Sequence, residues 1–303
     1  MLTFLFIVFL FFIIIYILNN TEIAQAYPVP GPSPDTVMKG GGPFEMTAGN
    51  KEAAMLIHGY GGTPKEMREL GELLHKKKYD IFAPLLPGHS VNEHHLAKSR
   101  FADWYREARR VYLEQRSKYK KFYLIGLSMG GSQVLKLTEE FSGTPLEPTA
   151  IVAIAAPVFL NAFIDGKFVI RDYRLFISGI IGRLVPLVQR KPISKEEKEA
   201  VPWLGYTKHQ ATAAVHSLKY NLKFVKKDLK KIKVPILIMH SKLDESVMYE
   251  NSPYIYTHVS SDVREFHTIE FDKGDKTEQH VMIQHKNMKE RIFNYIFDFL
   301  KKY

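Results

Sequence analysis

The stretch Phe122-Tyr123-Leu124-Ile125-Gly126-Leu127-Ser128-Met129-Gly130-Gly131 decides the fold of this chain of 303 residues. It begins with an apolar run of the length of a short buried strand, and a helical pattern follows Gly131. The glycines around Ser128 let a strand and a helix approach closely around a sharp turn. Such a turn exposes a serine hydroxyl at the carboxyl end of the strand, where the helix N-terminus favours negative charge. The stretch therefore predicts an α/β fold with a nucleophilic serine.

Short apolar runs alternate with longer amphipathic stretches along most of the chain. Thr63-Pro64-Lys65-Glu66 has the form of a capping box with proline at the first helical position, and an apolar helical face follows it. Two more helical faces lie over 101–112 and 292–299. This alternation predicts a mostly parallel, doubly wound α/β sheet. The expected strands are Ala53–Ile57, Ile81–Ala83, Phe122–Ile125, Ile151–Ala155, Ile236–Met239 and Phe266–Phe271.

One interval, from Val158 to about Asn221, breaks this alternation. It has no clear strand pattern, yet its first half is rich in large apolar residues such as Phe159, Phe163 and Phe168. A structureless loop of that length does not fit a compact domain. We therefore predict a helical cap inserted at about 158–221, which covers the functional edge of the sheet.

The chain opens with the run Leu2 to Leu18, in which Thr3 is the only clearly polar residue. So uniformly apolar a run predicts a membrane-inserting segment over residues 1–19. We expect a retained transmembrane anchor at the cell membrane, with the folded domain outside the cytoplasm, because no lysine or arginine precedes the run as in a signal peptide.

The alternative is secretion after cleavage behind Ala26, in the small-x-small sequence Ala24-Gln25-Ala26. Residues 20–42 contain several prolines and a run of three glycines, which is typical of a semi-extended linker. The folded domain is expected to cover residues 43–303.

Composition excludes several classes of function. The chain has no cysteine, so a disulfide scaffold, a thiolate metal site and a cysteine nucleophile are excluded together. The net charge of +10 suits a nucleic acid, an anionic membrane or a cell wall. The lysine-rich run from Lys223 to Lys233 lacks a nucleic-acid-binding motif, so we interpret it as a solvated helix face and expect no nucleic-acid partner. His89, His94 and His95 lack the carboxylate spacing of a metal-binding motif, so we expect no metal.

A nucleophilic serine needs a general base, and the base needs a carboxylate that orients it. Asp244 lies in the loop just past the predicted strand Ile236–Met239, where the acid belongs when the chain order is serine, acid, histidine. Glu245 is its nearest rival.

The histidines downstream of this acid include His267, His280 and His285. His267 falls inside a predicted strand and His285 inside the C-terminal helix pattern, so we expect both to be structural. His280 lies between them, at the end of a polar loop from which a base could reach Ser128. We therefore predict Ser128, Asp244 and His280 as the catalytic residues.

An anionic intermediate also needs hydrogen-bond donors. The glycine-rich stretch His58-Gly59-Tyr60-Gly61-Gly62 ends the first strong strand and can turn sharply. We predict the backbone N–H groups of Tyr60 and Met129 as the two oxyanion donors. His58 is expected to be a buried residue that supports this loop.

These motifs, with the pattern from His240 to Asp244, resemble the α/β-hydrolase superfamily. The resemblance covers residues 43–303 and is strongest to bacterial carboxylesterases and monoacylglycerol lipases, with serine-aminopeptidase-like hydrolases and lysophospholipases also similar. It implies the α/β-hydrolase fold with a helical cap, the roles given above and no cofactor. One departure is Gln279, which precedes His280 where the family commonly has glycine.

We expect a serine carboxylic-ester hydrolase that acts on small acyl esters such as monoacylglycerols, because the cap is aromatic and the N-terminus is apolar. One alternative is a serine aminopeptidase-like peptidase, which would hold the substrate's amine with an acidic cluster. The cap shows none, since basic residues prevail from Arg171 to Lys198. The other alternative is a catalytically silent domain that binds an envelope polymer through its positive charge.

Overall fold

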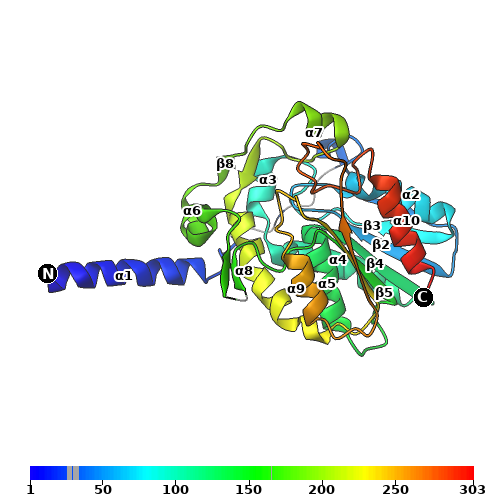
Figure 1. Ribbon diagram of the computed structural model, residues 1–303, viewed down its shortest axis with the longest axis horizontal. Helices are drawn as coiled ribbons and strands as arrows, with labels where there is room; N and C mark the ends of the chain where they lie inside the picture. Colours follow the sequence, from blue (N-terminus) through cyan, green and yellow to red (C-terminus); the bar gives the residue numbers. More distant parts are fainter. Residues whose placement is uncertain (26–28, 30–33, 165) are drawn as a thin grey trace.

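The computed structural model describes residues 1–25, 29, 34–164 and 166–303. Its centre is a seven-stranded sheet in the order β1-β3-β2-β4-β5-β10-β11 (Figure 1). Only the edge strand β1 pairs antiparallel with its neighbour; the other five pairings are parallel. The predicted mostly parallel α/β sheet is thereby confirmed.

Every predicted strand is present in this sheet, with ends shifted by a few residues, and four further strands of the described residues form two separate pairs. The strands are β1 (Phe44–Met46), β2 (Glu52–Ile57), β3 (Tyr79–Ala83), β4 (Lys121–Leu127), β5 (Ala150–Ile154), β6 (Ala162–Ile164), β7 (Lys167–Val169), β8 (Leu187–Gln189), β9 (His209–Ala211), β10 (Ile236–Ser241) and β11 (Arg264–Ile269). The α-helices are α1 (Leu2–Asn19), α2 (Arg68–Lys76), α3 (Glu93–Lys98), α4 (Phe101–Arg116), α5 (Met129–Phe141), α6 (Ser178–Leu184), α7 (Lys195–Ala200), α8 (Thr212–Asp228), α9 (Asn251–His258) and α10 (Lys289–Leu300). Four 3₁₀ turns are η1 (Pro34–Thr36), η2 (Pro64–Met67), η3 (Tyr173–Ile177) and η4 (Leu229–Lys231).

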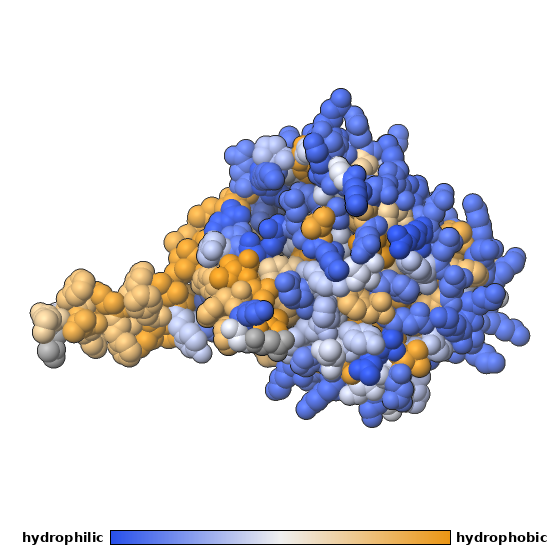
Figure 2. All heavy atoms as spheres, viewed as in Figure 1, coloured by the Kyte–Doolittle hydropathy of each residue, from blue (hydrophilic) through white to orange (hydrophobic). Residues whose placement is uncertain are grey.

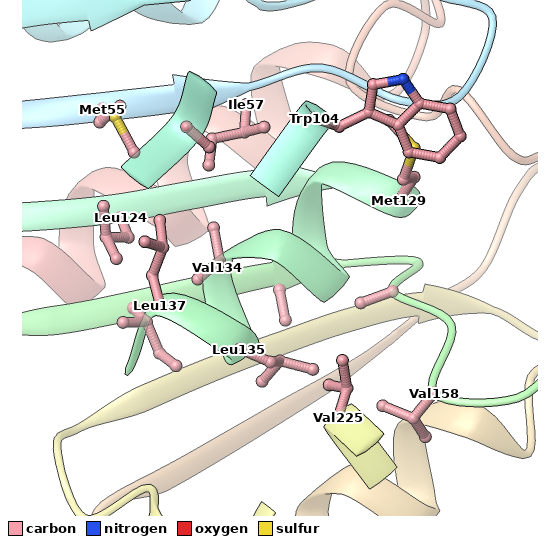
Figure 3. Packing of buried hydrophobic residues seen from close by; sticks show 14 of the residues in the cluster. Met55, Ile57, Trp104, Leu124, Met129, Val134, Leu135, Leu137, Val158 and Val225 are labelled. Atoms are coloured by element: carbon pink, nitrogen blue, oxygen red, sulfur yellow. The ribbon is translucent and has the colours of Figure 1, made fainter. Parts of the chain in front are cut away.

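The sheet is buried on both faces, which explains why its strands are continuous apolar runs. Successive residues of a strand point to opposite faces, so Met55 and Ile57 of β2 pack into one core and Leu56 into the other. Helices α4, α5, α8 and α9 contribute to the first core, and α2 and α10 to the second. Figure 3 shows the first core, where Val134 of α5 and Val225 of α8 lie beside the sheet.

The order of the strands fixes where a site can form. From β2 the chain continues to β3 on one side, and it then returns to β4 on the other side of β2. The loops that leave β2 and β4 therefore lie side by side at the carboxyl edge of the sheet. In open α/β sheets, ligands bind at such a switch point.

The segment between β5 and β10 differs from the purely helical insertion that the sequence predicts. It holds the helices α6 and α7, but also two antiparallel strand pairs, β6–β7 and β8–β9. Each of these strands has three residues, too short for an alternating pattern to be visible in the sequence. We call this segment the cap; its boundaries at 158 and 221 stay a prediction, and α8 runs across the second.

Helix α1 projects from the body of the protein (Figure 1). Its apolar side chains are largely exposed; for example, Phe4 is 68% and Ile17 is 50% exposed. Within the described residues, no helix has both the length and the apolar character that crossing a membrane requires. The predicted transmembrane anchor is therefore not supported. The alternative cleavage site at Ala26 and the prolines at 28, 30 and 32 of the predicted linker lie outside the described residues.

The last residues of α1, and Thr21 just after it, are hydrogen-bonded to the cap. The side chain of Asn19 accepts from the backbone N–H of Gly179 at 3.0 Å. Arg183 donates to the backbone oxygen of Leu18 at 3.0 Å and to the hydroxyl of Thr21 at 3.1 Å. The base of α1 and the helix α6 of the cap thus form one unit.

Candidate active site

Ser128 lies on the turn between β4 and α5, as the glycine spacing predicts. Its backbone has φ 55° and ψ −125°, a conformation that side chains rarely adopt. A Cβ on Gly130 would lie 2.1 Å from the backbone oxygen of Ile57, and one on Gly126 would lie 2.3 Å from Gly130. Only glycine fits at these two positions, and the close approach holds Ser128 at the carboxyl edge of the sheet.

The three predicted catalytic side chains come together at this edge. The hydroxyl of Ser128 lies 2.9 Å from Nε2 of His280. On the other side of the ring, Nδ1 of His280 lies 2.7 Å from Oδ2 of Asp244. With the Nδ1–H tautomer, His280 donates to the carboxylate and accepts from the serine hydroxyl, which is the arrangement that general-base activation of a serine requires.

The side chain of Asp244 is fully buried and held by several hydrogen bonds. Its Oδ1 accepts the backbone N–H groups of Ser246 at 2.7 Å and Val247 at 2.8 Å. Its Oδ2 also accepts from Nε2 of His240 at 3.1 Å, in addition to His280. Burial alone would raise the pKa of Asp244, but the charge of His280 and the hydrogen bonds from both histidines lower it to about 2. The carboxylate therefore stays ionised at neutral pH.

His280 is held in an environment that favours its cation. Burial alone would lower the pKa of His280, but the charge and hydrogen bond of Asp244 outweigh burial. The nearby carboxyl groups of Glu278 and Glu66 add to this effect, and the pKa is raised above the ordinary histidine value.

The loop before His280 explains how glutamine replaces the family's glycine. Gln279 has φ 51°, in the left-handed region that glycine adopts without strain. Its buried side chain accepts a hydrogen bond of 2.6 Å from the hydroxyl of Ser241, at the end of β10. This bond stabilises the turn and fixes the residue that precedes the base.

The rival residues do not take part in this chain of hydrogen bonds. The backbone N–H of Glu245 donates to Glu278, while Asp244 provides the contact with His280. His267 lies in β11 and stacks on Tyr295 at 4.2 Å between ring centroids. His285 was expected inside the C-terminal helix, but α10 begins only at Lys289 and His285 lies in the turn before it.

The two predicted oxyanion donors lie on the neighbouring loops after β2 and β4. Met129 is the first residue of α5, where the backbone N–H has no partner within the helix. The loop of Tyr60 is fixed by hydrogen bonds from Gly62 to Gly59 at 3.2 Å and from Tyr206 of the cap to Gly61 at 2.9 Å. As predicted, His58 is buried and supports this loop, since its Nε2 accepts the backbone N–H of Leu86.

A cavity of about 600 Å³ opens above Ser128 and His280, between the sheet edge and the cap. Its apolar lining includes Leu160, Leu175, Ile181, Val188 and Val281. The carboxyl-bearing residues Glu197, Glu245 and Glu278 also line it. The sequence showed no acidic cluster in the cap, because Glu197 of the cap meets the other two only in the folded chain.

Glu66 is a residue of the site whose role the sequence analysis missed. The predicted capping box holds only in part: Thr63 accepts from the backbone N–H of Lys65 at 3.3 Å. The carboxyl of Glu66 instead accepts the backbone N–H of Gly59 at 3.1 Å. It therefore contacts the oxyanion loop, whereas a capping box would pair it with Thr63.

The sequence of this chain is similar to that of known proteins. Residues 48–271 match the profile of the family described as serine aminopeptidase, S33. A thermostable monoacylglycerol lipase of Bacillus sp. (strain H-257) is 29% identical over 229 residues, which are 76% of this chain and 84% of that protein. A carboxylesterase of Bacillus subtilis (strain 168) is 25% identical over 240 residues, 76% of this chain and 90% of that protein.

Solved structures share the fold at lower identity. A structure from work on LipS and LipT, two metagenome-derived lipolytic enzymes, superposes with a TM-score of 0.75 at 23% identity, covering 88% of this chain and 100% of that one. A monoacylglycerol lipase of Paleococcus ferrophilus superposes with a TM-score of 0.65 at 16% identity, covering 85% and 98% of the two chains.

Proposed function

The chain belongs to the serine aminopeptidase S33 family and has the α/β-hydrolase fold, and from this premise we propose which bond it cleaves and how. Its relatives identify it as a serine ester hydrolase. The proposal is that it cleaves lipid-derived acyl esters, monoacylglycerols among them, through Ser128, His280 and Asp244.

The hydrogen-bonded chain from Ser128 through His280 to Asp244 supports this proposal most strongly. Ser128 attacks the ester carbonyl while Nε2 of His280 takes its proton. Asp244 holds the imidazole tautomer and stabilises the cation, and the backbone N–H groups of Tyr60 and Met129 receive the oxyanion. His280 then protonates the leaving alcohol, and water hydrolyses the acyl-enzyme with His280 again as base.

The cavity supports a substrate with an acyl chain. Its apolar residues come from both the cap and the loops of the sheet edge, and its volume of about 600 Å³ lies within the usual range of small-molecule sites. An acyl chain can lie along this apolar lining while the ester carbonyl reaches Ser128.

The test is the initial rate of the wild type and of Ser128→Ala on esters of rising acyl length. We expect long-chain esters to be preferred and the substitution to lower kcat by about a million-fold. Ser142→Ala is the matched control, because Ser142 is the C-cap of the same helix and its hydroxyl donates to the backbone oxygen of Lys231, away from the site. A Ser128→Ala variant that keeps the wild-type rate would overturn the catalytic assignment.

One observation favours the peptidase alternative enough to include it in the same experiment. Glu197, Glu245 and Glu278 line the cavity, and carboxylates can hold the amine of a peptide substrate. Turnover of an aminoacyl amide faster than of every ester, and its loss in Glu197→Gln, would establish a peptidase.

We further propose that the protein works at a lipid surface. Figure 2 shows that α1 is apolar and that apolar side chains continue from its base onto the cap. In the cap, Phe168 is 73% and Leu184 is 74% exposed. The net charge of +10 favours contact with anionic headgroups.

A further inference from the structure

The carboxyl group of Glu66 is buried beside the nucleophile, yet the reaction proposed above does not use it. Glu66 is 5% exposed and lies in η2, directly after the oxyanion loop. It lines the same cavity as Ser128 and His280. Burying a carboxyl group costs free energy unless the group has a specific hydrogen-bond partner.

The partner of Glu66 is the backbone of the oxyanion loop. Its Oε2 accepts the N–H of Gly59 at 3.1 Å. A Cβ on Gly59 would lie 3.4 Å from Cβ of Ser128 and 3.6 Å from Oε2 of Glu66, so Gly59 is packed between the two side chains. A Cβ on Gly62 would lie 1.9 Å from Oε1, so the carboxyl also lies against the far end of the loop. The carboxyl thus contacts the loop at both Gly59 and Gly62.

This support acts on the predicted donor at Tyr60. Glu66 holds the His58–Gly59 peptide, and the N–H of Gly62 holds the carbonyl of the next peptide, Gly59–Tyr60, which carries the N–H of Tyr60. Because the two peptides share the Cα of Gly59, a shift of the first would rotate the N–H of Tyr60 away from the carbonyl oxygen. An oxyanion donor is effective only when it is oriented before the charge develops.

We propose that Glu66 is a positioning residue of the oxyanion loop that works in its neutral form, and that its ionisation lowers the rate of ester cleavage. This inference rests on the proposed esterase function. A negative carboxylate here would oppose the negative charge that develops on the substrate oxygen. A neutral carboxylic acid still accepts the N–H of Gly59 through its carbonyl oxygen, and it adds no charge.

The surroundings of Glu66 allow both protonation states near neutral pH. Burial raises the pKa of Glu66 to about 7, against the opposing effects of the Gly59 hydrogen bond and the charge of His280. The neighbouring His58 contributes no charge, because burial lowers its pKa well below the ordinary value. The other charged side chains nearby have partners elsewhere: Lys65 lies 4.2 Å from the ring centre of Trp203, and Glu69 pairs with Lys289.

The sign of the pH effect follows from these charges. As the pH rises through about 7, Glu66 ionises and kcat is expected to fall severalfold. Glu66→Gln keeps an acceptor for Gly59 and cannot ionise, so its kcat should stay level at alkaline pH. Because the charge of Glu66 also raises the pKa of His280, the acid limb of this variant should move to lower pH.

The experiment measures kcat and KM of the full chain between about pH 5 and about pH 9 for the wild type, Glu66→Gln and Glu66→Met. The methionine variant removes the acceptor, and we expect kcat to fall about tenfold or more at every pH with KM little changed. Glu69→Gln is the matched control, since Glu69 is exposed in α2 and its substitution should leave the profile unchanged.

The outcomes separate this inference from the proposed function. If Ser128→Ala abolishes turnover but Glu66→Gln keeps the wild-type alkaline limb, the inference on Glu66 is overturned and the esterase proposal stands. If Ser128→Ala stays active, the proposed function itself fails. If Glu66→Met does not fold, the pH profile of the isosteric Glu66→Gln decides alone.

Discussion

At the scale of single residues, two carboxyl groups of the site have their pKa values shifted in opposite directions by their surroundings. Asp244 receives four hydrogen bonds and stays ionised, with a pKa of about 2. Glu66 has one backbone donor in a buried position, and its pKa is raised to about 7. The first arrangement favours a positive imidazole, and the second favours the neutral form of Glu66.

The raised pKa of His280 predicts the acid limb of activity. Only the neutral imidazole can accept the proton of Ser128, so activity is lost as the pH falls through the pKa of His280. Because Asp244 holds this pKa above the ordinary value, the limb should lie above about pH 6.5, with kcat/KM falling tenfold per pH unit below it. Stopped assays on a soluble ester across this range would measure the midpoint. A midpoint well below the ordinary histidine value would contradict the assignment of the base.

At the scale of elements, the site depends on how closely β4 and α5 approach each other. Gly126 and Gly130 lie where a Cβ would meet backbone atoms. Substituting either residue therefore lowers the free energy of unfolding through a main-chain clash, which a change of side-chain rotamer cannot relieve. The strained φ of Ser128 is held by the same contact.

We expect Gly130→Ala to lower the free energy of unfolding by about 3 kcal/mol or more, because the added Cβ would lie 2.1 Å from the oxygen of Ile57. Gly42→Ala is the control: its Cβ would make an ordinary contact of 3.7 Å with Val37, and we expect a change within about 0.5 kcal/mol. Urea unfolding of both variants measures the difference. Equal stability of the two would show that β4 and α5 do not need this close approach.

The elements also mark the limit of what the sequence could predict. The strands, and the placement of Ser128, Asp244 and His280 beside one another, could be predicted from apolar runs, the glycine spacing and the order of these residues along the chain. Their catalytic roles stay a prediction. Glu66 could not be assigned, since its local pattern fits a capping box and the choice of Gly59 as partner depends on the loop's fold. The antiparallel pair β8–β9 was missed for a similar reason, because its strands are three residues long and lie twenty residues apart along the chain.

At the scale of the whole molecule, the cap connects the active site with the apolar surface. The helix α6 carries Ile181 and the 3₁₀ turn η3 carries Leu175, and both residues line the cavity. The same helix is bonded to the end of α1 through Asn19 and Arg183. A lipid surface that contacts α1 therefore lies close to the residues that would receive an acyl chain.

This connection predicts a difference between dispersed and membrane-bound substrates. The double variant Phe168→Ser/Leu184→Ser makes the exposed cap surface polar and leaves the cavity residues unchanged. We expect its rate on monoacylglycerol in anionic vesicles to fall severalfold, while its rate on a water-soluble short-chain ester stays at the wild-type level. Val263→Ser is the matched control, since Val263 is also exposed but directly precedes β11, at the end of the strand away from the carboxyl edge where the cavity opens. Equal losses on both substrates would mean that the double variant damages the cap itself, and unchanged rates on both would mean that this surface does not contact lipid.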